Sequence, residues 1–107
     1  MTKFLIIDEG DFDNQVLQSE IPVIVEFGAE WCAPCKRMEP MMEEIALGWQ
    51  GKVKLIKIDV DDNVDLTMRY HVMGVPTIIL FKNGEPQERL TGAQNRKKLQ
   101  AKLGQHI

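Results

Sequence analysis

The chain has 107 residues, of which 44% are hydrophobic and 27% are charged, and its formal net charge is -3 at pH 7. This length fits one domain with its own hydrophobic core, and the composition is that of a folded globular protein rather than a disordered chain. No apolar run approaches the ~18 residues of a membrane span, and the acidic balance argues against a nucleic-acid-binding surface.

The first part of the chain predicts a strand, a helix and a second, more buried strand. Residues 4–7 form a short apolar run that is typical of a strand, and Asp11 is a candidate cap for a helix whose apolar face is formed by Phe12, Val16 and Leu17. Residues 21–27 are almost all apolar or β-branched, which is typical of a strand covered on both faces. We therefore expect this second strand at the centre of a sheet.

A long amphipathic segment follows the two cysteines. Its apolar residues recur at steps of three and four, which predicts a helix of about four turns with one buried stripe, formed by Met38, Met41, Met42, Ile45 and Trp49. Pro40 lies inside this segment, and we expect it to kink the helix. Gly51 should end the helix, and residues 53–58 then form a strand, which completes a parallel, right-handed strand–helix–strand unit.

The rest of the chain predicts a short helix, a hairpin and a final helix. A helical pattern covers residues 64–70, and residues 77–81 and 88–91 are strand-like. The Asn-Gly pair between these two strands is a strong hairpin signal. Residues 95–103 form an amphipathic helix that Gly104 should end. No linker or repeat interrupts this pattern, so we predict a single domain over residues 1–107.

The only two cysteines lie in the motif Trp31-Cys32-Ala33-Pro34-Cys35, between the predicted central strand and the long helix. A thiol attacks a disulfide only as the thiolate, and a helix N-terminus stabilises an anion. We therefore predict that Cys32 attacks a disulfide and that the more deeply buried Cys35 resolves the resulting mixed disulfide. Ala33 and Pro34 form the dipeptide between the cysteines, and Pro34 suits the first helical turn because its missing N–H needs no partner there.

Two other interpretations of the cysteine pair stay open. A zinc site needs about four ligands, and beyond the cysteines the chain offers only His71 and His106, which are far apart in the sequence. A structural disulfide between residues this close would constrain the unfolded chain little. The apolar stretch in residues 4–7 is too short for a secretory signal, so we expect a cytoplasmic protein, in which structural disulfides do not persist.

Two charged residues, Glu26 and Lys57, interrupt runs that should form buried strands. An isolated buried charge costs several kcal/mol, so we predict that the two residues pair across adjacent parallel strands. Alternatively, each side chain points to a sheet edge or to solvent. If Glu26 is buried beneath the helix start, its pKa is raised and it can take the proton of Cys35, with Lys57 tuning that pKa.

Together these motifs resemble the thioredoxin family. The similarity covers nearly the whole chain, in motifs that occur in the family's order: Val25-Glu26-Phe27, Ala29 to Lys36, Pro40, Lys57 to Asp61, Gly74-Val75-Pro76-Thr77, Phe81 to Gly84 and Thr91-Gly92-Ala93. The resemblance implies an α/β fold with a central five-stranded mixed sheet flanked by four helices. It implies protein-disulfide reductase activity through a redox-active Cys32–Cys35 disulfide, with no bound cofactor. Its partners would be protein disulfide substrates and a thioredoxin reductase that draws on NADPH or ferredoxin, and nothing suggests more than a monomer.

The resemblance also implies how a substrate would bind. The Val75–Pro76 bond would be cis, and the backbone of Val75 would offer hydrogen bonds to an extended substrate segment, in the manner of strand addition. An apolar docking surface around Cys32 would consist of Trp31, Gly74, Val75, Pro76, Gly92 and Ala93. Trp31 and Val75 could equally be core residues.

Three residues depart from the family pattern. Glu26 stands where the family usually has Asp, and its extra methylene moves the carboxylate relative to Cys35. The related protein disulfide isomerase domains also have Glu at this position. Gly28 replaces a common aromatic residue, which removes packing beside the active site and loosens the strand end. Ala33 replaces the usual Gly, a change expected to shift the redox potential by less than roughly 20 mV.

Two alternative functions compete with that of a disulfide-reducing electron carrier. The same fold could serve as an accessory binding subunit of a larger complex, for which the chain offers only Gly28 and Met73 beside the docking surface. It could also be a thiol oxidase or isomerase, which Glu26 suggests. Net oxidation needs an oxidising compartment, and the absence of a secretory signal argues against that function.

Overall fold

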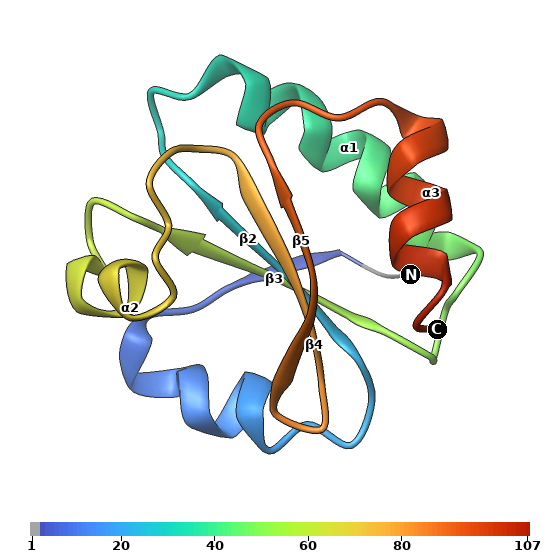
Figure 1. Ribbon diagram of the computed structural model, residues 1–107, viewed down its shortest axis with the longest axis horizontal. Coiled ribbons are helices and arrows are strands. Elements are labelled where there is room, and N and C mark those ends of the chain that lie inside the picture. Colours follow the sequence, from blue (N-terminus) through green and yellow to red (C-terminus); the bar gives the residue numbers. More distant parts are fainter. Residues whose placement is uncertain (1–2) are drawn as a thin grey trace.

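The computed structural model describes residues 3–107, in which five strands form one mixed sheet (Figure 1). The strands are β1 (Phe4–Ile6), β2 (Val23–Gly28), β3 (Lys54–Asp59), β4 (Thr77–Lys82) and β5 (Glu85–Thr91). Their spatial order is β1-β3-β2-β4-β5. β3 is parallel to both β1 and β2, while β4 is antiparallel to β2 and β5. The predicted central position of β2 is confirmed.

Four helical segments flank this sheet, as the resemblance implied. The first consists of a short 3-10 turn, η1 (Glu9–Asp11), followed by a π-helical turn, η2 (Asp13–Leu17). The others are α1 (Ala33–Leu47), α2 (Val64–Arg69) and α3 (Arg96–Gly104). α1 and α3 cover one face of the sheet, and η1, η2 and α2 lie on the other (Figure 1). None of the described helices is both long and apolar enough to cross a membrane.

β2 contributes to a separate hydrophobic core on each face of the sheet. Because side chains alternate along a strand, Val23, Val25 and Phe27 face the core beneath η2 and α2. Ile24 faces the core beneath α1 and α3. Glu26 shares this second face, and every residue of β2 is buried. A carboxylate therefore lies in the middle of the sheet, beneath the helix that begins at the cysteines.

The boundaries of three helices differ from those predicted. The first helical segment begins at Glu9, after Asp8 rather than at a cap on Asp11. α1 ends at Leu47 with Gly48 as its C-cap, because glycine is a poor helix former, and Gly51 instead supplies a positive φ of 83° in the following turn. α3 includes Gly104 and is capped by Gln105.

Other predicted features of the helices and turns are confirmed. Met38, Met42 and Ile45 are buried on one side of α1, and Met41 and Trp49 pack against the same core. Asn83 and Gly84 both have positive φ in the β4–β5 turn, as the Asn-Gly signal predicted, although β5 begins at Glu85. Pro40 lies inside α1; the kink expected there stays a prediction.

Candidate active site

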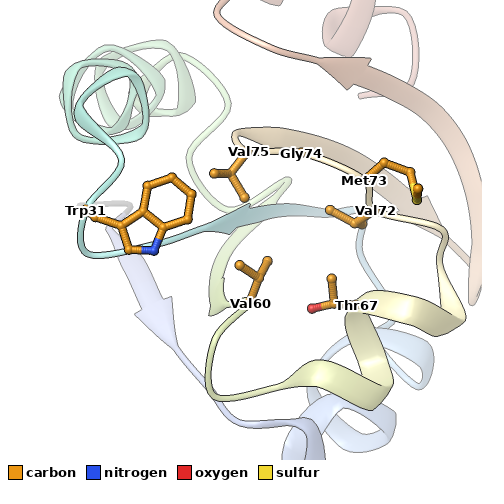
Figure 2. A pocket seen from close by; sticks show the side chains of 7 residues that line it. All are labelled: Trp31, Val60, Thr67, Val72, Met73, Gly74 and Val75. Carbon is orange, nitrogen blue, oxygen red and sulfur yellow. The ribbon is translucent and has the colours of Figure 1, made fainter.

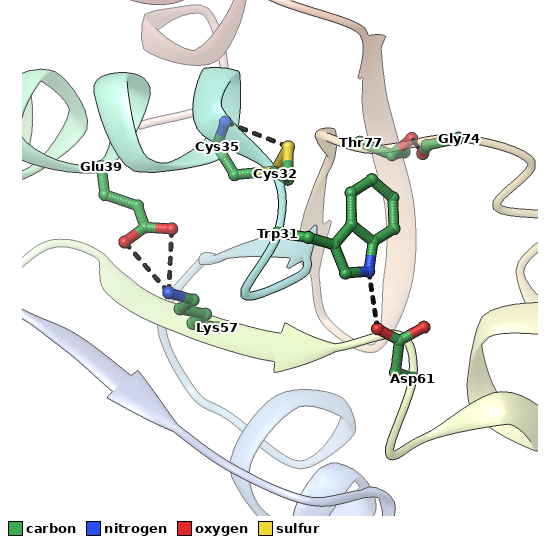
Figure 3. The surroundings of a disulfide bond; sticks show 8 residues. All are labelled: Trp31, Cys32, Cys35, Glu39, Lys57, Asp61, Gly74 and Thr77. Atoms are coloured by element: carbon green, nitrogen blue, oxygen red, sulfur yellow. Dashed lines mark hydrogen bonds and ion pairs between the residues drawn. A yellow bond between two sulfur atoms is a disulfide. The ribbon is translucent and has the colours of Figure 1, made fainter.

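The two cysteines lie at the start of α1 and are joined by a disulfide bond (Figure 3). Cys32 is the N-cap residue of α1, and its sulfur accepts a hydrogen bond from the backbone N–H of Cys35 at 3.2 Å. Cys35 is fully buried, whereas 3% of Cys32 is exposed, so the predicted order of burial is confirmed. Pro34 lies in the first turn of α1, with Ala33 exposed beside it.

The cysteine pair has no surroundings suited to zinc. Within residues 3–107, no group of three or more potential ligand side chains could hold a metal ion. His106 instead lies 3.3 Å from Glu88, next to α3 and β5. The zinc interpretation of the motif is therefore not supported by the geometry.

Glu26 lies directly beneath Cys35, because Gly28 has no side chain between them. A Cβ atom placed on Gly28 would be 3.3 Å from the Cys35 sulfur and 3.3 Å from Oε1 of Glu26. The Cys35 sulfur and Oε1 of Glu26 are therefore separated by no more than twice 3.3 Å. Glu26 is fully buried. No donor in the described chain makes a hydrogen bond to either of its carboxylate oxygens. The alternative that Glu26 points to an edge or to solvent is excluded.

The predicted ion pair between Glu26 and Lys57 is wrong, although their predicted adjacency is correct. The two residues are register partners in β2 and β3. Lys57 Nζ instead lies 2.9 Å from Oε2 of Glu39 and donates a hydrogen bond to its Oε1 at 3.0 Å (Figure 3). Glu39 reaches Lys57 because it lies one helical turn after Cys35, on the side of α1 that faces the sheet.

Glu39 is the site residue that the sequence reasoning missed. The signal that could have revealed it is its spacing of four residues from Cys35, which places both residues on the buried side of one helix. Its side chain is 20% exposed and that of Lys57 is 21% exposed. The ion pair is therefore largely shielded from water.

This environment strongly perturbs the titration of Glu26. Burial, the hydrogen bond to Glu39 and the negative charge of Glu39 raise the pKa of Glu26 from 4.5 to about 9, against the opposing effect of Lys57. Burial alone would lower the pKa of Lys57, but its hydrogen bond to Glu39 and the surrounding carboxylates raise it instead. At neutral pH, Glu26 is thus a neutral acid and Lys57 is a cation.

An apolar pocket of about 180 Å³ opens between Trp31, which precedes Cys32, and the segment that contains Val75 (Figure 2). It is lined by Trp31, Val60, Thr67, Val72, Met73, Gly74 and Val75. Trp31 is 68% exposed, so it is not a core residue, and its indole N–H donates to Asp61 at 2.8 Å. Val75 packs against the buried cluster that contains both cysteines.

The other residues predicted for substrate docking, Pro76, Gly92 and Ala93, do not line this pocket. The Val75–Pro76 peptide bond is cis, as the resemblance implied. The carbonyl of Pro76 accepts a hydrogen bond from the N–H of Gly92 at 2.8 Å, which joins the loop after β5 to the segment before β4. Gly92 and Ala93 do not line the pocket, and Ala93 is exposed.

Comparisons with known proteins agree with this geometry. The thioredoxin family model matches residues 3–105. The chain is 48% identical to thioredoxin of Rickettsia typhi over 87% of the chain and 89% of the relative. It is 39% identical to thioredoxin of Pseudomonas aeruginosa over 94% of each. The chain belongs to the thioredoxin family.

Members of the thioredoxin family are protein-disulfide oxidoreductases, and a cysteine pair joined as a disulfide at the start of α1 supports thiol–disulfide exchange. An accessory subunit without redox chemistry is not favoured. The chain is also 41% identical to mitochondrial thioredoxin of Bos taurus over 95% of the chain, but it spans only 61% of that relative's length.

Proposed function

We propose that the protein is a thioredoxin-type reductase of protein disulfides, with Cys32 as the attacking residue and Cys35 as the resolving residue. The observation that carries this proposal is the position of the disulfide, at the N-terminus of α1 and above a buried carboxyl group. The proposal includes a cytoplasmic, monomeric protein, although relatives named as mitochondrial thioredoxins are also similar to the chain.

In the reduced protein, the helix start favours the thiolate of Cys32 over its thiol. As the N-cap residue of α1, Cys32 lies beside backbone N–H groups that have no partner within the helix, and the N–H of Cys35 points at its sulfur. The thiolate attacks one sulfur of a substrate disulfide. A mixed disulfide forms, and the other substrate sulfur leaves with the electron pair.

Cys35 then attacks the sulfur of Cys32 and releases the reduced substrate. This step requires loss of the Cys35 proton, and Glu26 is the carboxyl group that shares the gap at Gly28 with the Cys35 sulfur. We assign the acceptance of this proton to Glu26, and Lys57 offsets part of the negative charge that forms there. Because Gly28 has no Cβ, it leaves room for the longer side chain of Glu26.

The pocket beside Cys32 provides a place for an apolar part of the substrate. Trp31 and Val75 line it, and Gly74 and Pro76 set the backbone path next to Val75. Gly92 is hydrogen-bonded to Pro76 at 2.8 Å, and we place Gly92 and the adjacent Ala93 in the same docking surface. An extended substrate segment would pair with the backbone of Val75, by strand addition. A thioredoxin reductase, linked to NADPH or ferredoxin, would then restore the dithiol.

Reduction of insulin disulfides by dithiothreitol tests this proposal. The protein should accelerate the reaction, and both Cys32→Ser and Cys35→Ser should abolish the acceleration. In the presence of protein disulfides, Cys35→Ser should accumulate a mixed disulfide through Cys32, whereas Cys32→Ser should accumulate none. A wild-type protein that fails to accelerate the reaction would overturn the proposal.

An equilibrium titration against glutathione separates a reductase from a thiol oxidase or isomerase. The specific reason for this test is Glu26, which is the residue shared with protein disulfide isomerase domains. A reductase should give a potential close to that of thioredoxin, about −270 mV, and an oxidase a potential nearer −120 to −180 mV. A value in the second range would contradict the proposed direction of electron flow.

A further inference from the structure

Both carboxylate oxygens of Glu26 lie buried between α1 and the sheet, with no hydrogen-bond donor among residues 3–107. The carboxylate of Glu39 differs, because the Lys57 ammonium lies 3.0 Å from its Oε1 and 2.9 Å from its Oε2. A buried polar atom without a partner costs about 1–3 kcal/mol, so the two oxygens of Glu26 need an explanation. Two carboxyl groups within hydrogen-bonding reach satisfy each other only if they share a proton, and Glu26 and Glu39 are within that reach.

The charged and titratable groups that face Glu26 leave it no other partner. From α1 it faces Cys35 and Glu39, and from β3 it faces Lys57, whose ammonium is already bound to Glu39. From β4 its register neighbour is Ile78, which is apolar. The charge of Glu30 acts on Lys57 more weakly than the charges of Glu39 and Glu26 do. Within the described chain, Glu39 is therefore the group that can accept a hydrogen bond from Glu26.

We propose that Glu39 is a positioning residue for the proton that Glu26 exchanges with Cys35. Lys57 holds the carboxylate of Glu39 in place, and this carboxylate accepts a hydrogen bond from protonated Glu26 while the disulfide is intact. Glu39 thereby keeps the proton on Glu26 and diverts Lys57 from it. This inference rests on the function proposed above, in which Cys35 is the thiol that resolves the mixed disulfide.

The proton has a defined path when the disulfide is reduced. A thiolate of a dithiol reductant attacks the sulfur of Cys32, the S–S bond breaks, and the sulfur of Cys35 leaves with the electron pair. The proton of Glu26 passes to this sulfur, which gives a Cys35 thiol and a Glu26 carboxylate flanked by Glu39 and Lys57. In the opposite direction, the Glu26 carboxylate removes the proton from Cys35 as that sulfur attacks the mixed disulfide.

Titration of Glu26 in the oxidised protein tests the role of Glu39 directly. Carbon NMR of side-chain-labelled glutamates follows the carboxyl groups, and the resonance missing from Glu26→Gln identifies Glu26. Glu39→Gln removes the charge and frees Lys57 to face Glu26, so the Glu26 midpoint should fall by about one pH unit or more. Glu39→Asp keeps the charge and should retain most of the shift. Glu44→Gln, an exposed residue on the same helix, should leave the midpoint unchanged.

The pH profile of mixed-disulfide resolution provides a second readout. An aromatic disulfide releases one thiol when Cys32 attacks and a second when Cys35 resolves, so the second release can be timed at each pH. The Glu39→Gln profile should move to lower pH together with the Glu26 midpoint. If Glu39→Gln leaves both the midpoint and the profile unchanged, the inference about Glu39 is wrong. If Cys35→Ser still releases both thiols, the proposed function itself fails.

Discussion

Glu26 and Lys57 are direct neighbours in the register of β2 and β3, yet the ammonium of Lys57 binds Glu39 instead of Glu26. The backbone brings the two residues together, but α1 places a second carboxylate within reach of the same cation. Glu26 is left without a counter-ion in contact, and its neutral form is favoured. The buried charge is thus removed by protonation rather than by an ion pair.

This state of Glu26 should make the protein less stable as the pH rises. The pKa of Glu26 is about 9 in the folded protein and close to 4.5 when the residue is exposed. Between these values the folded state holds a proton that the unfolded state has lost, so the free energy of unfolding falls with increasing pH. By pH 7 this loss should be on the order of 3 kcal/mol relative to pH 4.5.

Glu26→Gln should abolish this loss, because glutamine is neutral in both states. Urea unfolding of the oxidised variant should show a gain over the wild type that is about 4 kcal/mol larger at pH 8 than at pH 5. Glu30→Gln, which changes an exposed carboxylate nearby, should give no pH-dependent gain. A gain of equal size at both pH values would show that Glu26 is not the titrating group.

Lys57→Met should destabilise the protein, because it leaves the shielded carboxylate of Glu39 without its cation. We expect a loss of about 1–3 kcal/mol in urea unfolding, below the value for a fully buried pair because both side chains are about one-fifth exposed. The raised pKa of Lys57 means that its contribution is complete below pH 10.5 and is lost only as the pH rises further. The loss should therefore be the same at pH 6 and pH 8.

The matched control is Lys36→Met. Lys36 also pairs with a glutamate, Glu30, at 3.4 Å, but both side chains are more than half exposed. Exposed ion pairs contribute roughly 0–1 kcal/mol, so this variant should lose about 0.5 kcal/mol or less. Equal losses in the two lysine variants would mean that shielding by α1 does not strengthen the Lys57–Glu39 pair.

Gly28→Ala should disturb the contact between Glu26 and Cys35. The added methyl group would be only 3.3 Å from atoms of both residues, which is too close without a shift of one of them. Crowding of this kind typically costs about 1–3 kcal/mol, and resolution by Cys35 should slow. Gly10→Ala, where a Cβ meets no atom within 4 Å, should be neutral or slightly stabilising in the same unfolding assay.

A double-mutant cycle tests whether Glu26 and Gly28, two residues that depart from the family pattern, depend on each other. In a Glu26→Asp background the shorter carboxylate withdraws from Gly28, so Gly28→Ala should cost at least about 1 kcal/mol less than in the wild type. Additive losses in the double variant would show that Gly28 and Glu26 are independent. The cycle is measured by urea unfolding of the four oxidised proteins.

The fold was predictable because its signals are local and agree with one another. The continuous apolar run of β2 indicated a strand covered on both faces, and the Asn83-Gly84 turn fixed the hairpin of β4 and β5. The ends of helices were less predictable. Both Gly48 and Gly51 can follow a helix, and only the three-dimensional path shows that Gly48 caps α1 while Gly51 reverses the chain.

The site was predictable where a local motif carries the chemistry, and not where charges compete. Two cysteines at a predicted helix start favoured thiol–disulfide chemistry over a zinc site or a structural disulfide. The choice of Lys57 between two carboxylates depends on how α1 packs over β3, a long-range contact that no local pattern contains. The hydrogen bond from the Trp31 indole to Asp61 was not predictable for the same reason, since the two residues are 30 positions apart in the sequence.

Trp31→Ala should impair the reduction of protein disulfides much more than it affects stability. Two-thirds of the Trp31 side chain is exposed, so its loss removes little buried area, and we expect a change in the free energy of unfolding below about 1 kcal/mol. An exposed aromatic residue that lines a pocket is a typical binding hot spot, and its removal should lower kcat/KM for insulin roughly five- to thirtyfold. Reduction of a small aromatic disulfide should change by less than about threefold.

Two further variants separate docking from indirect effects. Met68→Ala removes a side chain that is equally exposed but lies on α2 outside the pocket, and its kcat/KM values should match the wild type. Asp61→Ala releases the indole from its 2.8 Å hydrogen bond, so it should have an intermediate effect on insulin. If Trp31→Ala slows the small and the protein disulfide equally, the indole acts on the reactivity of Cys32, and the pocket is not the docking surface.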